Sequence, residues 1–269
     1  MENRKILFTA PGKAELVPCE MPRIAPDEVL IETDYTAISA GTERANLLDM
    51  PNVTHQWPKH LGYSGSGRIV EVGTTVKNFR VGQRVLMDHL GHCAYAKARF
   101  QANGDGFYPV PEDVDPLEAA FVVVGSMGVQ GARKTRLQMG EAAMVTGLGL
   151  LGLFAVQSMV RMGATPLIAV DFAEDRRRVA LELGADEVWD PAKLDKASAE
   201  AMDKADVCVL MMGDDRLPGE PTATLAMRAT REGGCVVSYG HPEHGMRFSP
   251  YVFQSRDLTM VSPTSDHRI

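Results

Sequence analysis

The spacing of hydrophobic and polar residues changes character once along the chain, near residue 115. Before that point, short hydrophobic runs alternate with polar residues, and turns rich in proline and glycine separate them. A period of two is typical of strands with one buried face. This part is therefore predicted to be all β, in a partly open barrel. The predicted strands are KILFTA (5–10), EVLIETDYTAIS (28–39), GRIVEVG (67–73), QRVLMD (83–88) and YAKARF (95–100).

After residue 115, nearly continuous hydrophobic runs alternate with helical patterns. Asp115 is a good N-cap, Pro116 suits the first helical position, and Glu118 stands where a capping box has its carboxylate. Strand and helix alternation then predicts a doubly wound parallel sheet that is buried on both faces. The predicted strands are AAMVTGL (142–148), PLIAVD (166–171), EVWD (187–190), ADVCVLMMG (205–213), CVVSYG (235–240) and LTMVS (258–262).

These patterns predict an α/β protein of two domains, a β domain at 1–116 and a Rossmann domain at 117–269. The net charge of −7 argues against binding to nucleic acid, because no basic excess exists to neutralise phosphates. The sequence has no run of 18 hydrophobic residues and its N-terminus lacks the apolar core of a signal peptide, so no membrane partner is expected. Four cysteines without zinc-finger spacing favour a reduced, cytoplasmic protein.

Three glycines form the pattern G-x-G-x-x-G between a predicted strand and a predicted helix, at Gly147, Gly149 and Gly152. The first glycine permits a tight turn, the second lets a pyrophosphate approach the backbone, and the third lets helix and strand pack closely. The helix N-terminus, which includes Leu150 and Leu151, supplies N–H groups and a positive dipole end. The pattern predicts dinucleotide binding; the alternative is a vestigial Rossmann fold with a simple tight turn.

Asp171 ends the next predicted strand, 24 residues after Gly147. A carboxylate there accepts hydrogen bonds from the adenosine ribose and repels a 2′-phosphate, which favours NAD over NADP. Arg176 is a candidate to cover the adenine, although a solvated helix face explains three adjacent arginines equally well. By analogy with this fold, Gly213 and Gly240, at the ends of the fourth and fifth strands, are expected near the nicotinamide ribose.

Several segments together carry a resemblance to a known family. They are GYSGSGRIVEVGTTVKNFRVGQRV (62–85), CAYAKARF (93–100), YPVPEDVDPLEAAF (108–121) and the run from Val145 to Asp186. The chain resembles the medium-chain dehydrogenase/reductase superfamily, the relatives of zinc-type alcohol dehydrogenases. The resemblance implies a GroES-like β-barrel domain, a Rossmann domain and an NAD(P)-dependent alcohol dehydrogenase-like activity. SAGTE (39–43) and GYS (62–64) are similar to a subset that includes bacteriochlorophyllide dehydrogenases and sugar-linked oxidoreductases.

The resemblance also implies where the metal ligands of that family would fall. Its first zinc-binding Cys falls at Ala40, its His-Glu pair at Tyr63 and Ser64, and its third protein ligand near Val122 and Val123. None of these side chains is a usual zinc ligand. We therefore expect a protein without bound metal.

A relocated zinc site is the alternative. The loop DHLGHC contains Asp88, His89, His92 and Cys93, and His60 lies near in sequence to the GYS segment. Four ligands within six residues of loop rarely converge on one tetrahedral ion. A turn with partly solvated histidines is the simpler interpretation, and only Cys93 remains where the family has a structural zinc loop of four cysteines.

Without a metal, side chains must stabilise charge on the substrate oxygen and move its proton. Thr42 matches the family's Ser or Thr that begins the proton relay, and Tyr63 offers a phenol at an inherited ligand position. His92 is a candidate acid or base at neutral pH. Glu43 is a fourth candidate. Each has a plain alternative, because Thr42 suits a helix N-cap, Glu43 suits a first helical turn, and the others suit a polar lining.

The sequence thus predicts an NAD-dependent, zinc-independent oxidoreductase that acts on a small-molecule alcohol or carbonyl. The alternatives are a catalytically silent NAD(H)-binding regulatory subunit and a zinc alcohol dehydrogenase with relocated ligands. The chain ends earlier than the family it resembles, and DLTMVS (257–262) is expected to be an edge strand. Exposed sheet edges invite pairing, so we expect a homodimer or larger assembly.

Overall fold

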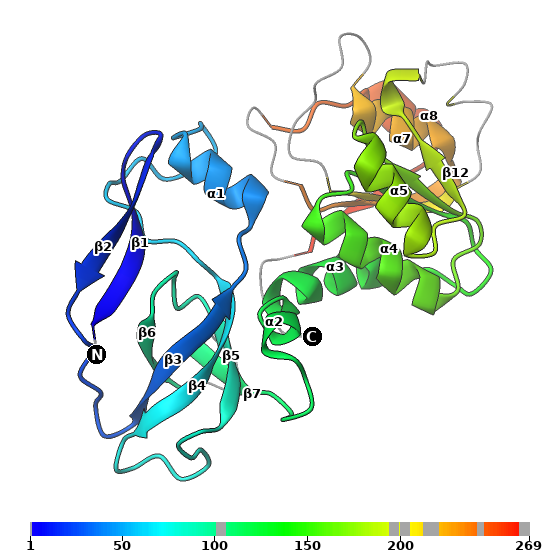
Figure 1. Cartoon of the computed structure of the whole chain (residues 1–269). Helices are drawn as coiled ribbons and strands as arrows, with labels where there is room; N and C mark the ends of the chain where they lie inside the picture. The colour runs from blue at the N-terminus through cyan, green and yellow to red at the C-terminus, as the bar shows by residue number, and fades with distance from the viewer. Residues whose placement is uncertain are drawn as a thin grey trace. The chain divides into compact units, whose positions relative to one another are not determined.

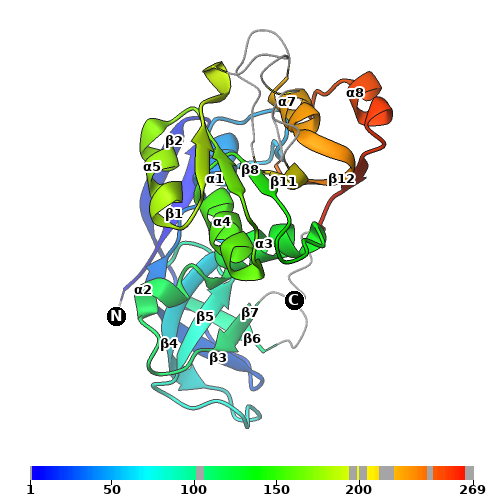
Figure 2. The same cartoon turned by 90° about the vertical axis from the view of Figure 1, so that its right-hand side faces the viewer.

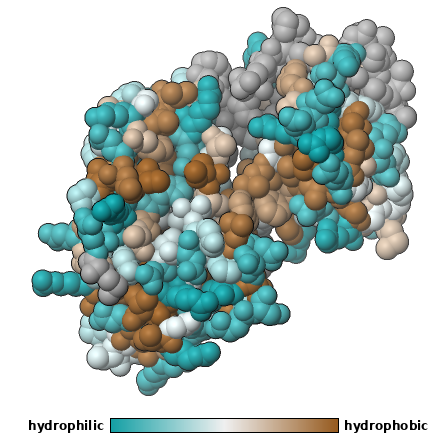
Figure 3. Space-filling view, in the orientation of Figure 1, coloured by the Kyte–Doolittle hydropathy of each residue, from teal (hydrophilic) through white to brown (hydrophobic). Residues whose placement is uncertain are grey.

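The computed structural model describes residues 2–100, 106–193, 199, 205–211, 221–240 and 245–263 (Figure 1). The chain divides into two compact units, one from the N-terminus through Val124 and one from Gly125 onward. Among the described residues, no helix is both long enough and apolar enough to cross a membrane. On the face of each unit drawn in Figure 3, hydrophobic side chains are interspersed with hydrophilic ones.

The first unit is built from antiparallel strands. Strands β1 (Asn3–Ala10) and β2 (Lys13–Cys19) form a hairpin. The other five form a sheet in the order β6-β3-β4-β5-β7, in which every neighbouring pair is antiparallel. These strands are β3 (Glu28–Thr36), β4 (Ser64–Val72), β5 (Arg84–Asp88), β6 (Tyr95–Arg99) and β7 (Gly106–Pro109). The five predicted strands are confirmed as β1, β3, β4, β5 and β6, and β2 and β7 are additions to them.

Alternation along these strands makes the core of the first unit. Val29 and Ile31 on β3 and Val85 and Met87 on β5 point to one interior, where Phe107 of β7 joins them. All five side chains are at most 2% exposed. Two short helices complete the unit, α1 (Ala40–Leu47) and α2 (Pro116–Ala119). Asp115 caps α2 by accepting the N–H of Leu117, as the sequence predicted.

The second unit contains a six-stranded sheet in which every neighbouring pair is parallel. Its order is β10-β9-β8-β11-β12-β13, so the chain winds outward in both directions from β8 and confirms the doubly wound prediction. The strands are β8 (Ala143–Thr146), β9 (Leu167–Val170), β10 (Glu187–Trp189), β11 (Ala205–Leu210), β12 (Thr230–Ser238) and β13 (Thr259–Val261).

Helices cover both faces of this sheet (Figures 1 and 2). Ala143 and Val145 of β8 face one core, and Met144 between them faces the other. Residues of α3 (Val122–Lys134), α4 (Leu150–Met162) and α5 (Glu174–Glu182) pack in the first core. Residues of α7 (Thr222–Ala229) and α8 (Pro250–Ser255) pack in the second. A 3₁₀ turn, η1 (Pro191–Lys193), follows β10.

One helix is shorter than the sequence predicts. The expected helix TATLAMRATREG (222–233) ends at Ala229, and Thr230 already has extended angles, φ −90° and ψ 133°. The hydroxyl of Thr230 donates to the carbonyl of Ala226 at 2.8 Å. This bond satisfies a carbonyl of the last helical turn where the helix ends. Strand β12 begins at that same threonine because it pairs with Ala205 at the start of β11. Tertiary pairing overrides the helical pattern here.

Candidate functional site

The glycine-rich turn of the second unit joins β8 to α4. Gly147 has φ +87°, a conformation that side chains other than glycine rarely adopt. A Cβ atom at Gly152 would lie 1.9 Å from the carbonyl oxygen of Gly147, so helix and turn approach too closely for any other residue. Both glycines therefore have the roles that the motif predicts for them.

The start of α4 has room for an anionic group. Gly149 is its N-cap, makes no side-chain capping bond, and has no atom within 4 Å of a Cβ built on it. Leu150 and Leu151 are the first two helical residues, and the first helical bond runs from the N–H of Leu153 to the carbonyl of Gly149. The N–H groups before Leu153 lack intrahelical acceptors. The turn fits a dinucleotide pyrophosphate, whose charge the helix N-terminus stabilises.

Asp171 follows β9 and is 8% exposed. One carboxylate oxygen accepts the N–H of Leu148 at 2.7 Å and the other accepts the N–H of Ala173 at 2.8 Å. Asp171 thus ties the glycine-rich turn to the end of β9, a structural role that sequence reasoning did not predict. Each carboxylate oxygen has a further lone pair, so both can still accept ribose hydroxyls. Arg176 lies beside it, with Nη1 3.6 Å from Oδ2, and its side chain is 55% exposed.

The two remaining cofactor candidates are Gly213 and Gly240. Gly213 falls outside the described residues. Gly240 follows β12, and its N–H donates to the carbonyl of Leu210 at 3.0 Å, as does the N–H of Tyr239 at 2.9 Å. These bonds hold the ends of β11 and β12 together. The Tyr239 hydroxyl donates to Gln130 on α3 at 3.1 Å.

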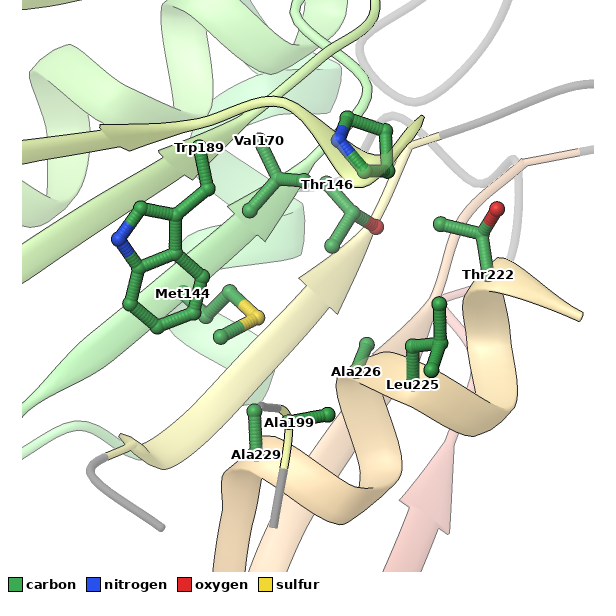
Figure 4. Close-up of a pocket in the computed structure, with 10 residues that line it drawn as sticks. Met144, Thr146, Val170, Trp189, Ala199, Thr222, Leu225, Ala226 and Ala229 are labelled. Carbon is green, nitrogen blue, oxygen red and sulfur yellow. The ribbon is translucent and has the colours of Figure 1, made fainter. Parts of the chain in front are cut away.

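A small cavity lies between the sheet and α7 in the same unit (Figure 4). Met144, Val170 and Trp189 reach into it from the strands, and small side chains of α7 such as Ala226 face them. Its volume of about 10 Å³ is the least that a single water occupies. The cavity is a packing defect of the core and too small for a substrate.

The first unit brings together polar side chains around the start of α1. The Tyr63 hydroxyl donates to Ser39 Oγ at 2.7 Å, and Ser39 Oγ donates to Thr42 Oγ1 at 3.3 Å. Ser39 is the N-cap of α1, so Thr42 is not the cap that the alternative interpretation suggested. Thr42 is exposed, Tyr63 is half-buried and Ser39 is buried. The three hydroxyls therefore form a chain whose middle member, Ser39, is buried and whose Thr42 end is exposed.

Glu43 and His92 form a buried pair behind this chain. Glu43 lies in the first turn of α1, and its Oε1 accepts the N–H of Ser39 at 2.8 Å. Its Oε2 lies 3.1 Å from His92 Nε2, and His92 Nδ1 lies 2.8 Å from Thr36 Oγ1. The side chains of His92 and Glu43 are 4% and 10% exposed. All four catalytic candidates thus join one network through Ser39, and two of them, Glu43 and His92, are buried.

A second acid–histidine pair borders Tyr63. Asp88, at the end of β5, is 2% exposed, and its Oδ1 lies 2.6 Å from His89 Nδ1. The His89 ring stacks on the Tyr63 ring with centroids 5.6 Å apart. Sequence reasoning considered Asp88 and His89 only as metal ligands and did not single out Ser39. The position of Ser39 directly before a helical pattern was the available clue, because serine is a preferred N-cap.

The environment of Tyr63 keeps its phenol neutral. Burial raises the pKa of Tyr63, the hydrogen bond to Ser39 lowers it, and the nearby Glu43 carboxylate raises it, with a net shift upward. A tyrosine with a raised pKa stays protonated at neutral pH. Tyr63 can therefore donate to an oxygen or pass on a proton as a neutral hydroxyl, and it does not act as a standing phenolate.

The inherited zinc positions do not offer a ligand set. Ser64 is 3% exposed and donates its hydroxyl to the carbonyl of Ala120 at 2.6 Å, and Tyr63 is engaged with Ser39. Burial raises the pKa of the Cys93 thiol to about 11. Among the residues that the structure describes, no group of three or more His, Cys, Asp or Glu side chains could hold a metal ion. The relocated set around DHLGHC does not converge in that part of the chain.

Family comparisons agree with both halves of this architecture. A family model described as "Alcohol dehydrogenase GroES-like domain" matches residues 25–132, and one described as "Zinc-binding dehydrogenase" matches residues 151–265. The chain belongs to the medium-chain dehydrogenase/reductase superfamily. The predicted fold of a GroES-like domain followed by a Rossmann domain is confirmed.

Relatives within the superfamily are distant. The zinc-type alcohol dehydrogenase-like protein YdjJ of Escherichia coli K12 is 28% identical over 72% of this chain and 65% of its own length. The (R,R)-butanediol dehydrogenase of Bacillus subtilis is also 28% identical, over 69% of this chain and 62% of its own. The chain therefore spans slightly less than two thirds of these relatives. A zinc-binding dehydrogenase of Sinorhizobium meliloti bound to NADP superposes with a TM-score of 0.84 at 22% identity, over 97% of this chain and 84% of that one.

Proposed function

We propose that the protein is an NAD-dependent, zinc-independent oxidoreductase that transfers a hydride between the nicotinamide and a small alcohol or carbonyl substrate. The observation that carries this proposal is the hydroxyl chain of Tyr63, Ser39 and Thr42. One of its members, Tyr63, stands at a position where the superfamily resemblance expects a metal ligand. The division of labour follows the predicted domains, with residues 1–116 serving the substrate and residues 117–269 the cofactor.

The cofactor half of the proposal rests on the glycine-rich turn and Asp171. The bound nicotinamide would supply the hydride chemistry. Gly147 and Gly152 shape the turn, and the helix N-terminus at Gly149 would hold the pyrophosphate. Asp171 supports NAD over NADP, because a buried carboxylate disfavours a 2′-phosphate. The similar structure from Sinorhizobium meliloti is bound to NADP, so the affinities of this chain for the two cofactors are to be measured directly.

The substrate half assigns a role to each candidate. In carbonyl reduction, Tyr63 would donate its hydroxyl hydrogen to the substrate oxygen, where a metal ion would otherwise polarise it. Thr42 would connect the site to solvent, since it is the exposed member of the chain. Glu43 and His92 are buried and bonded to each other, so they would position α1 and its hydroxyls. They would not meet the substrate themselves.

Turnover and metal content test the proposal together. We expect the purified protein to oxidise or reduce at least one member of an alcohol and carbonyl panel with NAD(H). Activity should survive prolonged chelation, and elemental analysis should find no stoichiometric zinc. One equivalent of zinc that is lost together with activity would overturn the metal-free mechanism and favour relocated ligands.

A catalytically silent NAD(H)-binding subunit is the second candidate. The observation in its favour is that His92 and Glu43, two of the four catalytic candidates, are buried and fully engaged with neighbours. A protein of this kind would bind NADH with ordinary affinity and turn over no alcohol or carbonyl. Fluorescence titration of NADH beside the turnover panel separates the two candidates.

We also propose that the protein works as a homodimer or larger assembly in the cytoplasm. β13 lies at one edge of the sheet of the second unit, and an exposed edge strand can pair with a second copy. Tyr251 on the neighbouring α8 is 76% exposed, which adds apolar surface there. Light scattering at micromolar concentration is expected to give at least twice the chain mass. A clean monomer would count against the proposal.

A further inference from the structure

Ser39 uses its hydroxyl in an unusual way for the N-cap of a helix. A serine at the N-cap ordinarily accepts an N–H from the first turn, a bond that stabilises the helix by about 1 kcal/mol. Ser39 makes no such bond. Its Oγ instead accepts the Tyr63 hydroxyl at 2.7 Å and donates to Thr42 Oγ1 at 3.3 Å. The side chain is thus committed to the hydroxyl chain at the expense of helix capping.

The backbone around Ser39 fixes where that hydroxyl lies. The Ser39 N–H donates to Glu43 Oε1, and the Ser39 carbonyl accepts the N–H of Glu43, both at 2.8 Å. Glu43 is held in turn by His92 at 3.1 Å. Ser39 itself is 8% exposed. The buried acid–histidine pair therefore holds the serine in place between Tyr63 and Thr42.

We infer that Ser39 is the middle member of a proton relay, Tyr63–Ser39–Thr42, which carries the hydroxyl proton of an alcohol substrate to solvent. The inference rests on the proposed function and adds to it the path of the proton. The hydrogen bonds give the order of the members, and exposure identifies the solvent end, since Thr42 is exposed whereas Ser39 is buried and Tyr63 is half-buried.

The steps balance in alcohol oxidation. The oxidised nicotinamide, which the turn from Gly147 to Gly152 would hold, would accept the hydride of the carbinol C–H bond. The substrate O–H bond breaks and its proton passes to the Tyr63 oxygen. Tyr63 releases its own proton to Ser39 Oγ, Ser39 releases its own to Thr42 Oγ1, and Thr42 releases its own to water. Each hydroxyl gains one proton and loses one, so the relay ends neutral, and carbonyl reduction runs it in reverse.

The groups around Tyr63 give a readout that does not need turnover. Glu43 lies close enough to raise the pKa of Tyr63, and the His89 ring stacks on its phenol. The bond to Ser39 is the contact that lowers the Tyr63 pKa. Its removal should shift the ionisation of Tyr63 to higher pH. The protein has six tyrosines. Subtracting the ultraviolet titration curve of Tyr63→Phe from that of the natural protein leaves the ionisation of Tyr63 alone.

The experiment compares Ser39→Ala, Ser39→Thr and a matched control, Ser66→Ala. Ser66 is a buried serine of the same unit whose hydroxyl donates to the carbonyl of Pro116 at 2.6 Å, away from the relay. Ser39→Ala should lower turnover by roughly 10²-fold, the low end for loss of a positioned proton-transfer group. Ser39→Thr should recover most of it. The proton inventory in mixed light and heavy water should be curved for the natural protein and linear for Ser39→Ala.

The outcomes separate this inference from the proposed function. Two results would overturn the relay alone when the natural protein is active. In one, Ser39→Ala turns over no more slowly than Ser66→Ala. In the other, Tyr63 ionises at the same pH in Ser39→Ala as in the natural protein. Intact NADH binding without turnover in the natural protein overturns the proposed function and removes the reaction that the relay would serve. Slow turnover, a raised Tyr63 pKa and recovery in Ser39→Thr together support the relay, and the Tyr63 titration also reports whether Ser39→Ala is folded.

Discussion

The two candidate sites are built in opposite ways. In the second unit, the glycine-rich turn offers backbone N–H groups. Its geometry is possible only because Gly147 and Gly152 have no side chains. In the first unit, the site offers hydroxyls of Tyr63, Ser39 and Thr42, and its geometry depends on side chains that hold one another. A site made of backbone fails when an atom is added, whereas a site made of side chains fails when an atom is removed.

Removal of one oxygen from the first unit should have the largest effect. Tyr63→Phe keeps the ring that stacks on His89 and deletes the hydroxyl that bonds to Ser39. Losing one donor to a developing oxyanion typically costs about 10²–10³-fold in rate. We expect a fall of that size in kcat, measured in steady-state assays. The affinity for NADH should stay the same, since the candidate cofactor residues belong to the other unit.

A contrary outcome would be equally informative. Equal fall in kcat and in NADH affinity would mean that Tyr63 supports the fold of the protein more than the chemistry. An unchanged kcat would remove Tyr63 from the site and leave its hydroxyl chain as a structural feature.

Addition of one carbon to the second unit should have the next largest effect. A Cβ at Gly152 would lie 1.9 Å from the Gly147 carbonyl, so Gly152→Ala must displace the turn or the helix. We expect NADH affinity to fall by about 100-fold, the equivalent of roughly 2.7 kcal/mol. The melting temperature should fall as well, because the same contact packs α4 against the turn that follows β8.

Gly149→Ala is the matched control for that prediction. Nothing lies within 4 Å of a Cβ at Gly149, so the cofactor-free fold should tolerate it. The added methyl group would occupy the space in front of the helix N-terminus, and affinity should fall without a change in melting temperature. If both glycine variants bind NADH as tightly as the natural protein, the turn is not the phosphate site.

The same contrast explains what the sequence could predict of the fold. The six strands of the second unit follow hydrophobic runs, and all six are present in the predicted order along the chain. The helix expected through Gly233 ended early because Thr230 pairs with Ala205, a partner 25 residues away that local periodicity does not contain. Strand β2 escaped prediction because Pro18 interrupts its pattern, yet the residue is tolerated opposite Arg4 in a two-stranded hairpin.

Prediction of the sites divides in the same way. The glycine motif lies within six neighbouring residues, Gly147 to Gly152, so both the turn and its geometry could be predicted from the sequence. The hydroxyl network joins residues that are 24 positions apart, Tyr63 and Ser39, and an acid–histidine pair that is 49 apart, Glu43 and His92. The sequence suggested most of these members separately. Their connection through Ser39 needed the fold, because no pattern of spacing links a helix N-cap to a residue before β4.

The preference for NAD over NADP should be the smallest of these effects. It tests whether a side chain, and not only the backbone, contributes to cofactor recognition in the second unit. Asp171 holds Leu148 and Ala173 with its two oxygens, so its charge is partly compensated before any cofactor binds. Arg176, 3.6 Å away, offsets it further.

We still expect NADH to bind at least about tenfold more tightly than NADPH, because a misplaced phosphate needs to cost only about 1.4 kcal/mol. Fluorescence titration of both reduced cofactors measures this ratio. Asp171→Asn removes the charge and keeps one acceptor oxygen for the backbone N–H groups of Leu148 and Ala173, and should bring the two affinities together. Equal affinities in the natural protein would leave Asp171 with its structural bonds alone, and the second unit would then recognise its cofactor by backbone only.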